Sequence, residues 1–581
     1  LIGHGSCTWV ISYLGSICAG CIPCCLFEED AFETHLANVK HLEPSVIIAS
    51  SQTVVRSFYH VKDELPFLRN IVYWNDNQKP PSQIQQILDL EEKRTGDRRN
   101  NWYGVYTWTS FLDVSKDAEH TAELDNRKKN LRPGRCCCIL TTQGTTGSQK
   151  PVMLTHDNVT WTASALQANL NLTVKDSIVS CLPMACATSQ IFCLHLALVS
   201  GCSVSFPIRN DVQFSDMLTA LRAIKPTHVI ARAPFWQQVA GIVKSQITEA
   251  HGTKAKTFSW ALERGKSVAE KQQGIGLASG QPNSSKGASW GLAKRLVFSK
   301  MWETVGLDEC RYAACFGPCV DSDTLDLLAS IGRPVLCMYG ATETSGVQGL
   351  TILTKTHSSS PKFRHGYSGR ALPGTKILFR KQAGEVSPEC ELHELEVAGR
   401  NVMLGYYKQA KRCLQVFDDD GVFRTHDIGK IDSDSMLIKI ECRDTEIITL
   451  STGKQVSACF YEAYLKQFLP FVSGVVMIGN GMPFVSCLIT LPLKAKQPST
   501  TKQEVYLDDE FIKFLQHKNI RIHTIQDARK SDSFTSLLIQ GVQRVNQSLP
   551  PFYPAIKRFS ILGRQFSVEG GELTPLQEVR R

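Results

Sequence analysis

The amino-acid sequence predicts an α/β protein: a large N-terminal part with parallel-rich sheets, helices and a β-rich corner, followed by a small α+β part. Apolar runs such as "PSVIIAS" and "NIVYWND" follow helix-like stretches in the first 80 residues, which is typical of strands alternating with helices. The alternation returns between residues 139 and 240, and again in "RYAACFGP" and "PVLCMYGATETSG". A chain of 581 residues exceeds one ordinary core, so two or more domains are expected.

The first apolar run, from Trp9 to Phe27, raises the alternatives of a transmembrane segment or a signal peptide. It is short and is interrupted by Gly15, Gly20 and Pro23. It therefore predicts a core helix followed by a strand.

Cysteine spacing in the same run also allows a metal-site interpretation. Cys18, Cys21, Cys24 and Cys25 have CxxCxxC spacing, but they lie in an apolar context without a partner cluster, so we predict buried structural cysteines. Cys136 to Cys138 are interpreted in the same way, as buried strand residues. The 21 cysteines are scattered and odd in number, which indicates a reducing intracellular setting.

The charge balance does not select a partner. The formal net charge is +9 without a long basic run, on a chain of globular composition. Such a surface suits an anionic small ligand or an acidic membrane surface as well as nucleic acid.

Later segments complete the predicted organisation. Residues 84–135 are polar and predict a surface helix and a loop, and the Gly/Ser-rich residues 265–289 predict a mobile excursion. Short strands and turns are expected from about 365 to 440. A smaller region of mixed strands and helices is expected from 444 to 581.

The stretch "TTQGTTGSQKP" has the features of an anion-binding loop after a strand. Gly144 and Gly147 let the backbone turn its N–H groups toward an anion, Thr145 and Thr146 add hydroxyl groups, and Lys150 adds a positive charge. The glycine spacing excludes a Walker A loop. A plain turn is an equally common explanation of such a loop taken alone.

The stretch "MYGATETSG" places a ring, a hydroxyl and a carboxylate at the end of an apolar strand. Tyr339, Thr342 and Glu343 there suit a site that stacks a base and holds Mg²⁺. The alternative is a strand-to-helix turn with an N-cap threonine. Farther along, Asp427 in "GVFRTHD" could accept the hydroxyls of a ribose or belong to a turn, and Arg443 could be a ligand contact or a surface charge.

Taken together and in this order, these stretches resemble the adenylate-forming (AMP-binding) superfamily. "TTQGTTGSQKP" is similar to its phosphate loop, "YGATE" to its YGxTE motif, "GVFRTHD" to its ribose motif and "CRDTE" to its hinge motif. The segments "PVMLTHDNVTWTA", "AKRLVFSKMWETVGLDEC" and "FSVEGGELTP" look like those of long-chain acyl-CoA synthetases of the bubblegum branch. The resemblance covers nearly the whole chain, but the family extends further at each end, so it implies a chain truncated at both ends.

The resemblance implies a two-step ligase that uses ATP, Mg²⁺, a long-chain fatty acid and coenzyme A. It implies an AMP-binding domain over 1–443 and a mobile C-terminal domain over 444–581, which rotates about a hinge near Asp444–Thr445. Lys150, Thr342 and Glu343 would be catalytic, and Glu343 and Thr142 would hold Mg²⁺. By match, the nucleotide-binding residues are Thr142, Gln143, Gly144, Thr145, Thr146, Gly147, Ser148, Gln149, Lys150, Tyr339, Gly340, Ala341, Thr342, Glu343, Thr344, Asp427 and Arg443.

The sequence also departs from the family pattern. Gln143 replaces a small Ser or Thr, Pro151 and Cys442 replace glycines, Cys186 replaces a His, and His426 replaces the Gly before the ribose aspartate.

The gravest departure comes at the end of the chain, where Glu578 occupies the position of the family's catalytic lysine, with Arg580 as a substitute cation. The alternative explanation of this departure is a gene-model error over residues 574–581. The second functional hypothesis is therefore a catalytically weakened paralogue that binds ATP or acyl chains as a regulatory or scaffold protein. An adenylating enzyme for another acceptor is less favoured, because the sequence predicts no carrier domain within these 581 residues.

The lipid substrate and the family imply a cytoplasmic protein, with peripheral association with the endoplasmic reticulum or other membranes as an alternative. No nucleic-acid partner is expected. The sequence leaves the oligomeric state and the acyl chain length open.

Overall fold

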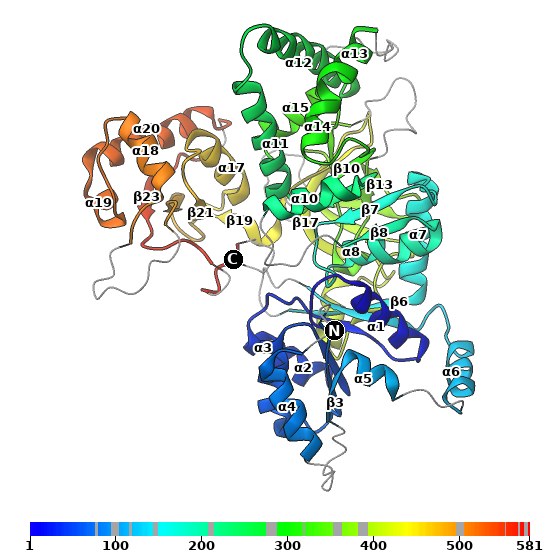
Figure 1. The fold of residues 1–581 in the computed structure, drawn as a ribbon. Helices are drawn as coiled ribbons and strands as arrows, with labels where there is room; N and C mark the ends of the chain where they lie inside the picture. Colours follow the sequence, from blue (N-terminus) through cyan, green and yellow to red (C-terminus); the bar gives the residue numbers. More distant parts are fainter. Residues whose placement is uncertain are drawn as a thin grey trace.

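The computed structural model describes residues 1–75, 80–93, 104–114, 119–142, 149–206, 214–274, 288–317, 320–351, 363–381, 393–494, 505–551, 553–567, 570–573 and 579–580. Its fold is the predicted one, with α/β layers and parallel sheets followed by a smaller C-terminal part (Figure 1). In Figure 1 the orange and red elements of the smaller part lie beside the large part.

The central sheet of the large part contains five parallel strands in the order β11-β10-β9-β7-β8. These strands are β7 (Ser177–Ser180), β8 (Ser203–Ser205), β9 (His228–Ala231), β10 (Tyr312–Phe316) and β11 (Val335–Met338). Successive side chains of a strand point to opposite faces, and Val229 joins one hydrophobic cluster while Ile230 joins another. Both faces of this sheet are therefore covered, as parallel sheets require.

Two further sheets form the N-terminal region. The first holds the parallel strands β2 (Val46–Ala49), β3 (Asn70–Tyr73) and β4 (Gly104–Thr107). The second has the order β1-β5-β6-β16 and holds β1 (Cys24–Cys25), β5 (Cys136–Thr141), β6 (Pro151–Thr155) and β16 (Gly405–Tyr406).

The large part also contains α-helices. They are α1 (Cys7–Cys18), α2 (Phe32–Leu42), α3 (Gln52–His60), α4 (Ser82–Lys93), α5 (Trp108–Asp113), α6 (Glu119–Lys129), α7 (His156–Leu170), α8 (Ala187–Gln190), α9 (Ala197–Ser200), α10 (Phe214–Ile224), α11 (Ala233–Thr248), α12 (Gly252–Gln272), α13 (Ala288–Ala293), α14 (Ser299–Thr304), α15 (Ser322–Ser330) and α16 (Ala410–Val416). The start of α7 shows why a helix begins there. Thr155 and Asn158 form a capping box at its N-terminus, which satisfies two backbone donors.

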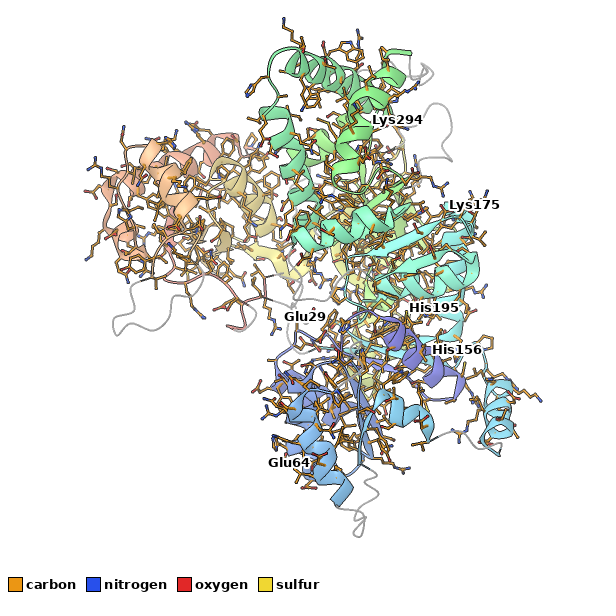
Figure 2. All side chains as sticks on the ribbon, viewed as in Figure 1. Glu29, Glu64, His156, Lys175, His195 and Lys294 are labelled. Atoms are coloured by element: carbon orange, nitrogen blue, oxygen red, sulfur yellow. The ribbon has the colours of Figure 1, made fainter. Side chains whose placement is uncertain are left out.

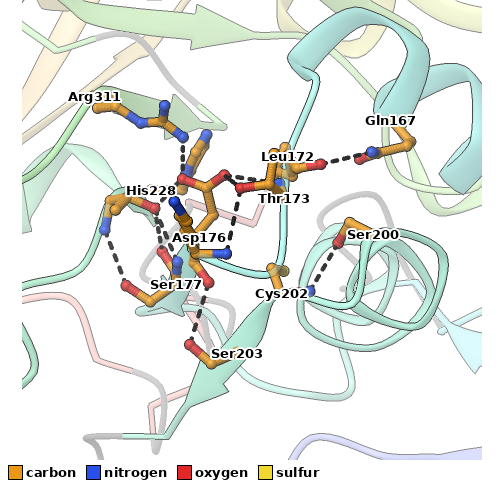
Figure 3. Close-up of polar contacts among 12 residues, drawn as sticks. Gln167, Leu172, Thr173, Asp176, Ser177, Ser200, Cys202, Ser203, His228 and Arg311 are labelled. Carbon is orange, nitrogen blue, oxygen red and sulfur yellow. Dashed lines mark hydrogen bonds and ion pairs between the residues drawn. The ribbon is translucent and has the colours of Figure 1, made fainter.

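The amino ends of the central strands are joined by a polar cluster around Asp176 (Figure 3). Its carboxylate accepts from the backbone N–H of Thr173 at 2.8 Å and pairs with Arg311. The Thr227 hydroxyl accepts from Ser177 N at 2.9 Å and contacts His228 Nδ1 at 2.8 Å. This cluster ties β7, β9 and β10 together at the sheet edge opposite the one that leads to Tyr339, so we assign it a structural role.

A β-rich corner follows, as predicted. It contains the antiparallel strands β14 (Lys376–Lys381), β15 (His393–Ala398), β17 (Phe423–Ile431) and β18 (Ile438–Arg443). A short pair, β12 (Gly349–Leu350) with β13 (Arg370–Ala371), precedes it.

The C-terminal part has its own hydrophobic cluster, formed by residues between 448 and 561. Its strands are β19 (Ile447–Thr449), β20 (Gln455–Ser457), β21 (Gly474–Ile478), β22 (Ser486–Thr490) and β23 (Arg558–Ile561). Its helices are α17 (Ala458–Phe468), α18 (Asp509–His517), α19 (Ile525–Lys530) and α20 (Asp532–Ser548).

Three sequence predictions need correction. The polar stretch 84–135 holds the paired strand β4 and three helices rather than a helix and a loop, because the short run "GVYT" pairs with β3. The predicted excursion at 265–289 begins inside α12, which continues to Gln272; residues 275–287 lie outside the described residues. Among the N-terminal cysteines Cys25 is buried as predicted, but Cys21 is exposed.

The N-terminal apolar run forms the predicted helix and strand, α1 and β1. Across the described ranges, no helix combines the length and apolarity that crossing a membrane would need.

Candidate active site

The two ends of the predicted phosphate loop are joined at its base. Thr142 N donates to Lys150 O at 3.0 Å, and Lys150 N donates to the Thr142 hydroxyl at 3.0 Å. Pro151 begins β6, a strand position that tolerates a residue without an N–H, so this departure is compatible with the loop. The predicted loop residues Gln143, Gly144, Thr145, Thr146, Gly147 and Ser148 lie outside the described residues.

The residue before the lysine is fixed by two side chains. Gln149 Nε2 donates to Asp30 Oδ2 at 2.9 Å, and its Oε1 accepts from Asn38 Nδ2 at 2.7 Å. Asp30 is buried, and burial raises the pKa of its carboxyl group despite the hydrogen bond from Gln149. The end of the loop is thereby attached to α2.

Lys150 and Glu343 approach the same tyrosine ring. Lys150 Nζ lies 5.5 Å from the ring centroid of Tyr406, and the Tyr406 hydroxyl donates to Glu343 Oε1 at 2.9 Å. Burial, followed by the negative charge of Glu343, raises the pKa of Tyr406. The tyrosine is therefore held as a neutral donor that orients the carboxylate beside the lysine.

Tight backbone packing shapes the loop that carries Glu343. Thr342–Thr344 form one short 3₁₀ turn, and Gly346 follows with φ of 86°. A Cβ on Gly346 would lie 2.5 Å from Thr188 N, and a Cβ on Gly340 would lie 2.3 Å from Gly346 O. Only glycine fits these two positions, which sets the path of the chain between Tyr339 and Val347.

The predicted adenine, ribose and arginine residues form a second connected group. Tyr339 Oη donates to Asp427 Oδ2 at 2.7 Å, and Arg443 Nε lies 3.2 Å from Asp427 Oδ1. Asp427 and Arg443 are direct partners across β17 and β18. Burial raises the pKa of Asp427, and the charge of Arg443 opposes that shift. Tyr339 directly follows β11 and Glu343 lies four residues later in the 3₁₀ turn Thr342–Thr344, so the same short segment joins the two groups of residues.

His426 has a left-handed backbone, with φ of 60°. Such a conformation favours glycine, which explains the Gly that the motif carries at this position. Its imidazole Nδ1 lies 2.8 Å from Asp444 Oδ2, so the departure adds a contact to the first residue of the predicted hinge.

Three other predicted positions have different outcomes. Glu578 lies outside the described residues. Arg580 is exposed, and its charge opposes the rise that burial causes in the pKa of Asp30. Cys186 is buried at the start of α8, where burial raises the pKa of its thiol.

Sequence reasoning missed Tyr406 and Asn401. Asn401 is fully buried; its carbonyl accepts from the Ser345 hydroxyl at 2.8 Å, and it therefore supports the Glu343 loop from the other side. Both residues belong to "AGRNVMLGYY", which the sequence marked as strand and turn only. The signal that could have identified them is a pair of polar residues beside two glycines.

The donor set fits Mg²⁺ in part. Glu343 supplies a half-buried carboxylate, and Mg²⁺ is commonly held by one or two carboxylates together with water and substrate phosphates. No group of three or more His, Cys, Asp or Glu residues among the described ranges could hold a metal ion by itself. A Mg²⁺ ion here would arrive with the nucleotide phosphates.

Comparisons with known proteins identify the family of the chain. The AMP-binding enzyme family model matches residues 1–407, and the model of the AMP-binding enzyme C-terminal domain matches residues 445–532. The chain is 26% identical over 587 residues to long-chain-fatty-acid–CoA ligase ACSBG2 of Xenopus laevis, covering 100% of this chain and 74% of that protein. It is 25% identical to human long-chain-fatty-acid–CoA ligase ACSBG1, covering 100% of this chain and 75% of that protein.

Solved structures support the fold. The ATP-bound RpMatB-BxBclM chimera B3 has a TM-score of 0.61 at 15% identity, covering 100% of this chain and 88% of that one. The AMP-bound A-PCP didomain of carboxylic acid reductase from Segniliparus rugosus has a TM-score of 0.64 at 14% identity, covering 100% and 69%. Because the family model spans most of the chain and the motif side chains meet at one site, the chain belongs to the AMP-binding enzyme family.

Proposed function

We propose that the chain is a long-chain fatty acid–CoA ligase, which forms an acyl-adenylate from ATP and then a thioester with coenzyme A. The observation that carries this proposal is the convergence of Lys150, Tyr406 and Glu343 beside Tyr339 and Asp427. The names of the bubblegum-type relatives, aligned over the full chain, support the substrate class.

The residues on the phosphate side of the site supply and orient charge. A carboxylate that attacks a phosphate brings two anions together, so the site must supply positive charge and fix the geometry. Lys150 supplies a cation at the end of the loop, and Tyr406 orients the Glu343 carboxylate. Mg²⁺ bound through Glu343 would neutralise phosphate oxygens.

The residues on the nucleoside side of the site hold one carboxylate in a fixed position. Asp427 is buried and held from two sides by Tyr339 and Arg443, so its oxygens are fixed before the ligand arrives. On nucleotide binding, the carboxylate would accept from ribose hydroxyls, and the ring of Tyr339 would lie against the base. Thr342 would contact the α-phosphate.

We further propose that adenylation is slow, because Glu578 stands where the family carries its catalytic lysine. Two unit charges about 4 Å apart interact by roughly 4 kcal/mol at an effective dielectric of about 20. Replacing attraction by repulsion would therefore cost about 10³-fold or more in rate. The weakened paralogue that binds ATP or acyl chains without turnover remains the second candidate, and the same glutamate favours it.

ATP–pyrophosphate exchange with palmitate tests both candidates. We expect ATP binding with slow exchange in the unmodified protein, and a rise of about 10³-fold in Glu578→Lys. The exposed helix substitution Glu263→Lys is the matched charge control and should change neither quantity. Robust exchange in the unmodified protein would exclude the weakened paralogue. No gain in Glu578→Lys would show that the last motif is misplaced.

A further inference from the structure

His426 links the ribose strand to the first residue after β18. The residue lies in β17 directly before Asp427, and its left-handed backbone turns the side chain toward η5, the short 3₁₀ turn Asp444–Glu446. Imidazole Nδ1 lies 2.8 Å from Asp444 Oδ2 and 3.8 Å from Glu394 Oε1. A glycine at this position, as in the family motif, could make neither contact.

The charges around the imidazole come from each element packed against it. Asp444 of η5 and Glu394 of β15 attract a protonated ring, and Arg424 of β17 opposes them. Arg424 is itself paired with Glu394 at 2.8 Å, which reduces its effect on the ring. The hydrogen bond and charge of Asp444 therefore dominate, and the pKa of His426 is raised.

We propose that His426 is a positioning residue that fastens the hinge at Asp444 to the ribose-binding strand and so holds the C-terminal part in the orientation seen here. This inference rests on the proposed function. In a two-step ligase the small domain rotates between adenylation and thioester formation, and this contact would have to break during that rotation. The contact lies at the boundary itself: η5 begins at Asp444, and the C-terminal family model begins at residue 445.

The strength of this contact should depend on pH. A histidine whose pKa is raised in the folded state is protonated and fully engaged below its ordinary pKa, and the charge-assisted part of the bond is lost as pH rises through the raised value. The hinge should therefore be fastened more firmly at pH 6 than at pH 8.5. Asp427, the predicted ribose-binding carboxylate next to His426, does not take part in this contact. Its oxygens are bound by Tyr339 and Arg443.

Two substitutions separate the hydrogen bond from the charge. His426→Gly accepts the backbone conformation and removes the ring. His426→Asn also tolerates a left-handed backbone, and its side-chain amide can replace Nδ1 as a donor without titrating. Hydrogen–deuterium exchange of peptides covering 444–449, corrected for intrinsic pH dependence, reports the hinge directly and needs no turnover. Peptides of α7 serve as the internal control.

In the unmodified protein we expect hinge exchange to be about three- to tenfold faster at pH 8.5 than at pH 6. His426→Asn should remove this pH dependence and stay protected, whereas His426→Gly should exchange fast at both pH values. Equal hinge exchange in the unmodified protein and His426→Gly at both pH values would overturn the proposal, as would fast exchange in both variants. Failure of the ligase assignment would instead appear as absent ATP–pyrophosphate exchange with the hinge result unchanged.

Discussion

Gln149, one of the predicted nucleotide-binding residues, has its side chain bound to the protein rather than free for a ligand. It bridges Asp30 and Asn38 and immediately precedes Lys150. These two bonds therefore hold the backbone from which the Lys150 side chain extends. The amide group therefore acts on ATP binding through Lys150 rather than by touching the nucleotide.

The substitution Gln149→Ala should weaken ATP binding by about three- to thirtyfold, since two hydrogen bonds that fix the loop are lost and one of them is to a charged group. Calorimetric titration with ATP measures this change. Gln85→Ala removes an exposed helix hydrogen bond to Asp89 and is the matched control. An unchanged ATP dissociation constant in Gln149→Ala would show that the loop is held by other contacts.

Glu29, between β1 and α2 (Figure 2), is a largely buried carboxylate that directly precedes Asp30. Burial raises its pKa from the ordinary 4.5 to about 7, and its Oε2 is buried without a hydrogen-bond partner in the described part of the chain. Since the folded-state pKa is raised, this residue's contribution to stability is fully present below pH 4.5 and is lost as pH rises through 7. At about 1.4 kcal/mol per pKa unit, the loss is roughly 3 kcal/mol.

We therefore expect Glu29→Gln to raise the thermal midpoint at pH 8 and to leave it nearly unchanged at pH 5. Glutamine keeps the shape of the neutral acid and removes the cost of burying a charge. A thermal melt at the two pH values measures the difference. A midpoint at pH 8 equal to or below that of the unmodified protein would contradict the expectation.

At the scale of elements, the turn after β11 is built around glycines. Gly346 has φ of 86°, and any Cβ there would meet the backbone of Thr188 at 2.5 Å. The turn carries Thr342 and Glu343, so a shift in its backbone moves two groups of the site. Its rigidity is a condition for holding the carboxylate against Tyr406.

Gly346→Ala should lower the thermal midpoint and weaken ATP binding at least about tenfold, because strain and overpacking together cost roughly 2–4 kcal/mol. Gly241→Ala in α11 is the matched control: apart from the chain neighbours and the backbone of α11 itself, no atom of the described residues lies within 4 Å of the added Cβ, and alanine favours a helix interior. The control should be neutral or slightly stabilising. Equal behaviour of the two variants in melts and ATP titrations would refute the steric argument.

The elements also show where sequence reasoning succeeds. Apolar runs beside turn residues correctly predicted β2, β3, β10 and β11, because their burial on both faces leaves an unbroken hydrophobic signal. The strand β4 was missed because its four residues lie in a polar stretch and are fixed only by pairing with β3. The hydrophobic pattern of a short segment does not reveal that it pairs with a strand from a distant part of the sequence.

The same limit applies to the site. Ordered motifs placed Lys150, Glu343, Tyr339, Asp427 and Arg443, and the structure brings these residues together. The sequence did not predict that Tyr406 would join two of the motifs, since it lies more than 60 residues from Glu343. Nor did it predict that a histidine would be accommodated where the motif carries glycine.

At the scale of the whole molecule, the last described residues lie beside the predicted hinge. Leu573 and Val579 form an antiparallel bridge, and Arg580 N donates to Glu572 O at 2.8 Å. These contacts fix the backbone of Val579 and Arg580 against Glu572 and Leu573. The Arg580 side chain lines a cavity of about 640 Å³ together with Thr445 and Arg558. A cation two positions after Glu578 in the sequence thus lies beside the predicted hinge.

Because Arg580 lines this cavity together with the predicted hinge residue Thr445, we expect it to supply positive charge to the site. Arg580→Ala should therefore reduce ATP–pyrophosphate exchange by about tenfold, equivalent to about 1.4 kcal/mol of barrier. Arg580→Lys keeps the charge and should retain most of the exchange. Arg558→Ala removes the other arginine of the same cavity, which stacks on Phe484 at 5.5 Å, and should change exchange by less than about twofold. If Arg580→Ala and Arg558→Ala have equal effects, the cavity contributes only general positive charge. A specific loss in Arg580→Ala that Arg580→Lys restores would place the cation of the adenylation step at the very end of the described chain, two residues from where the family motif puts it.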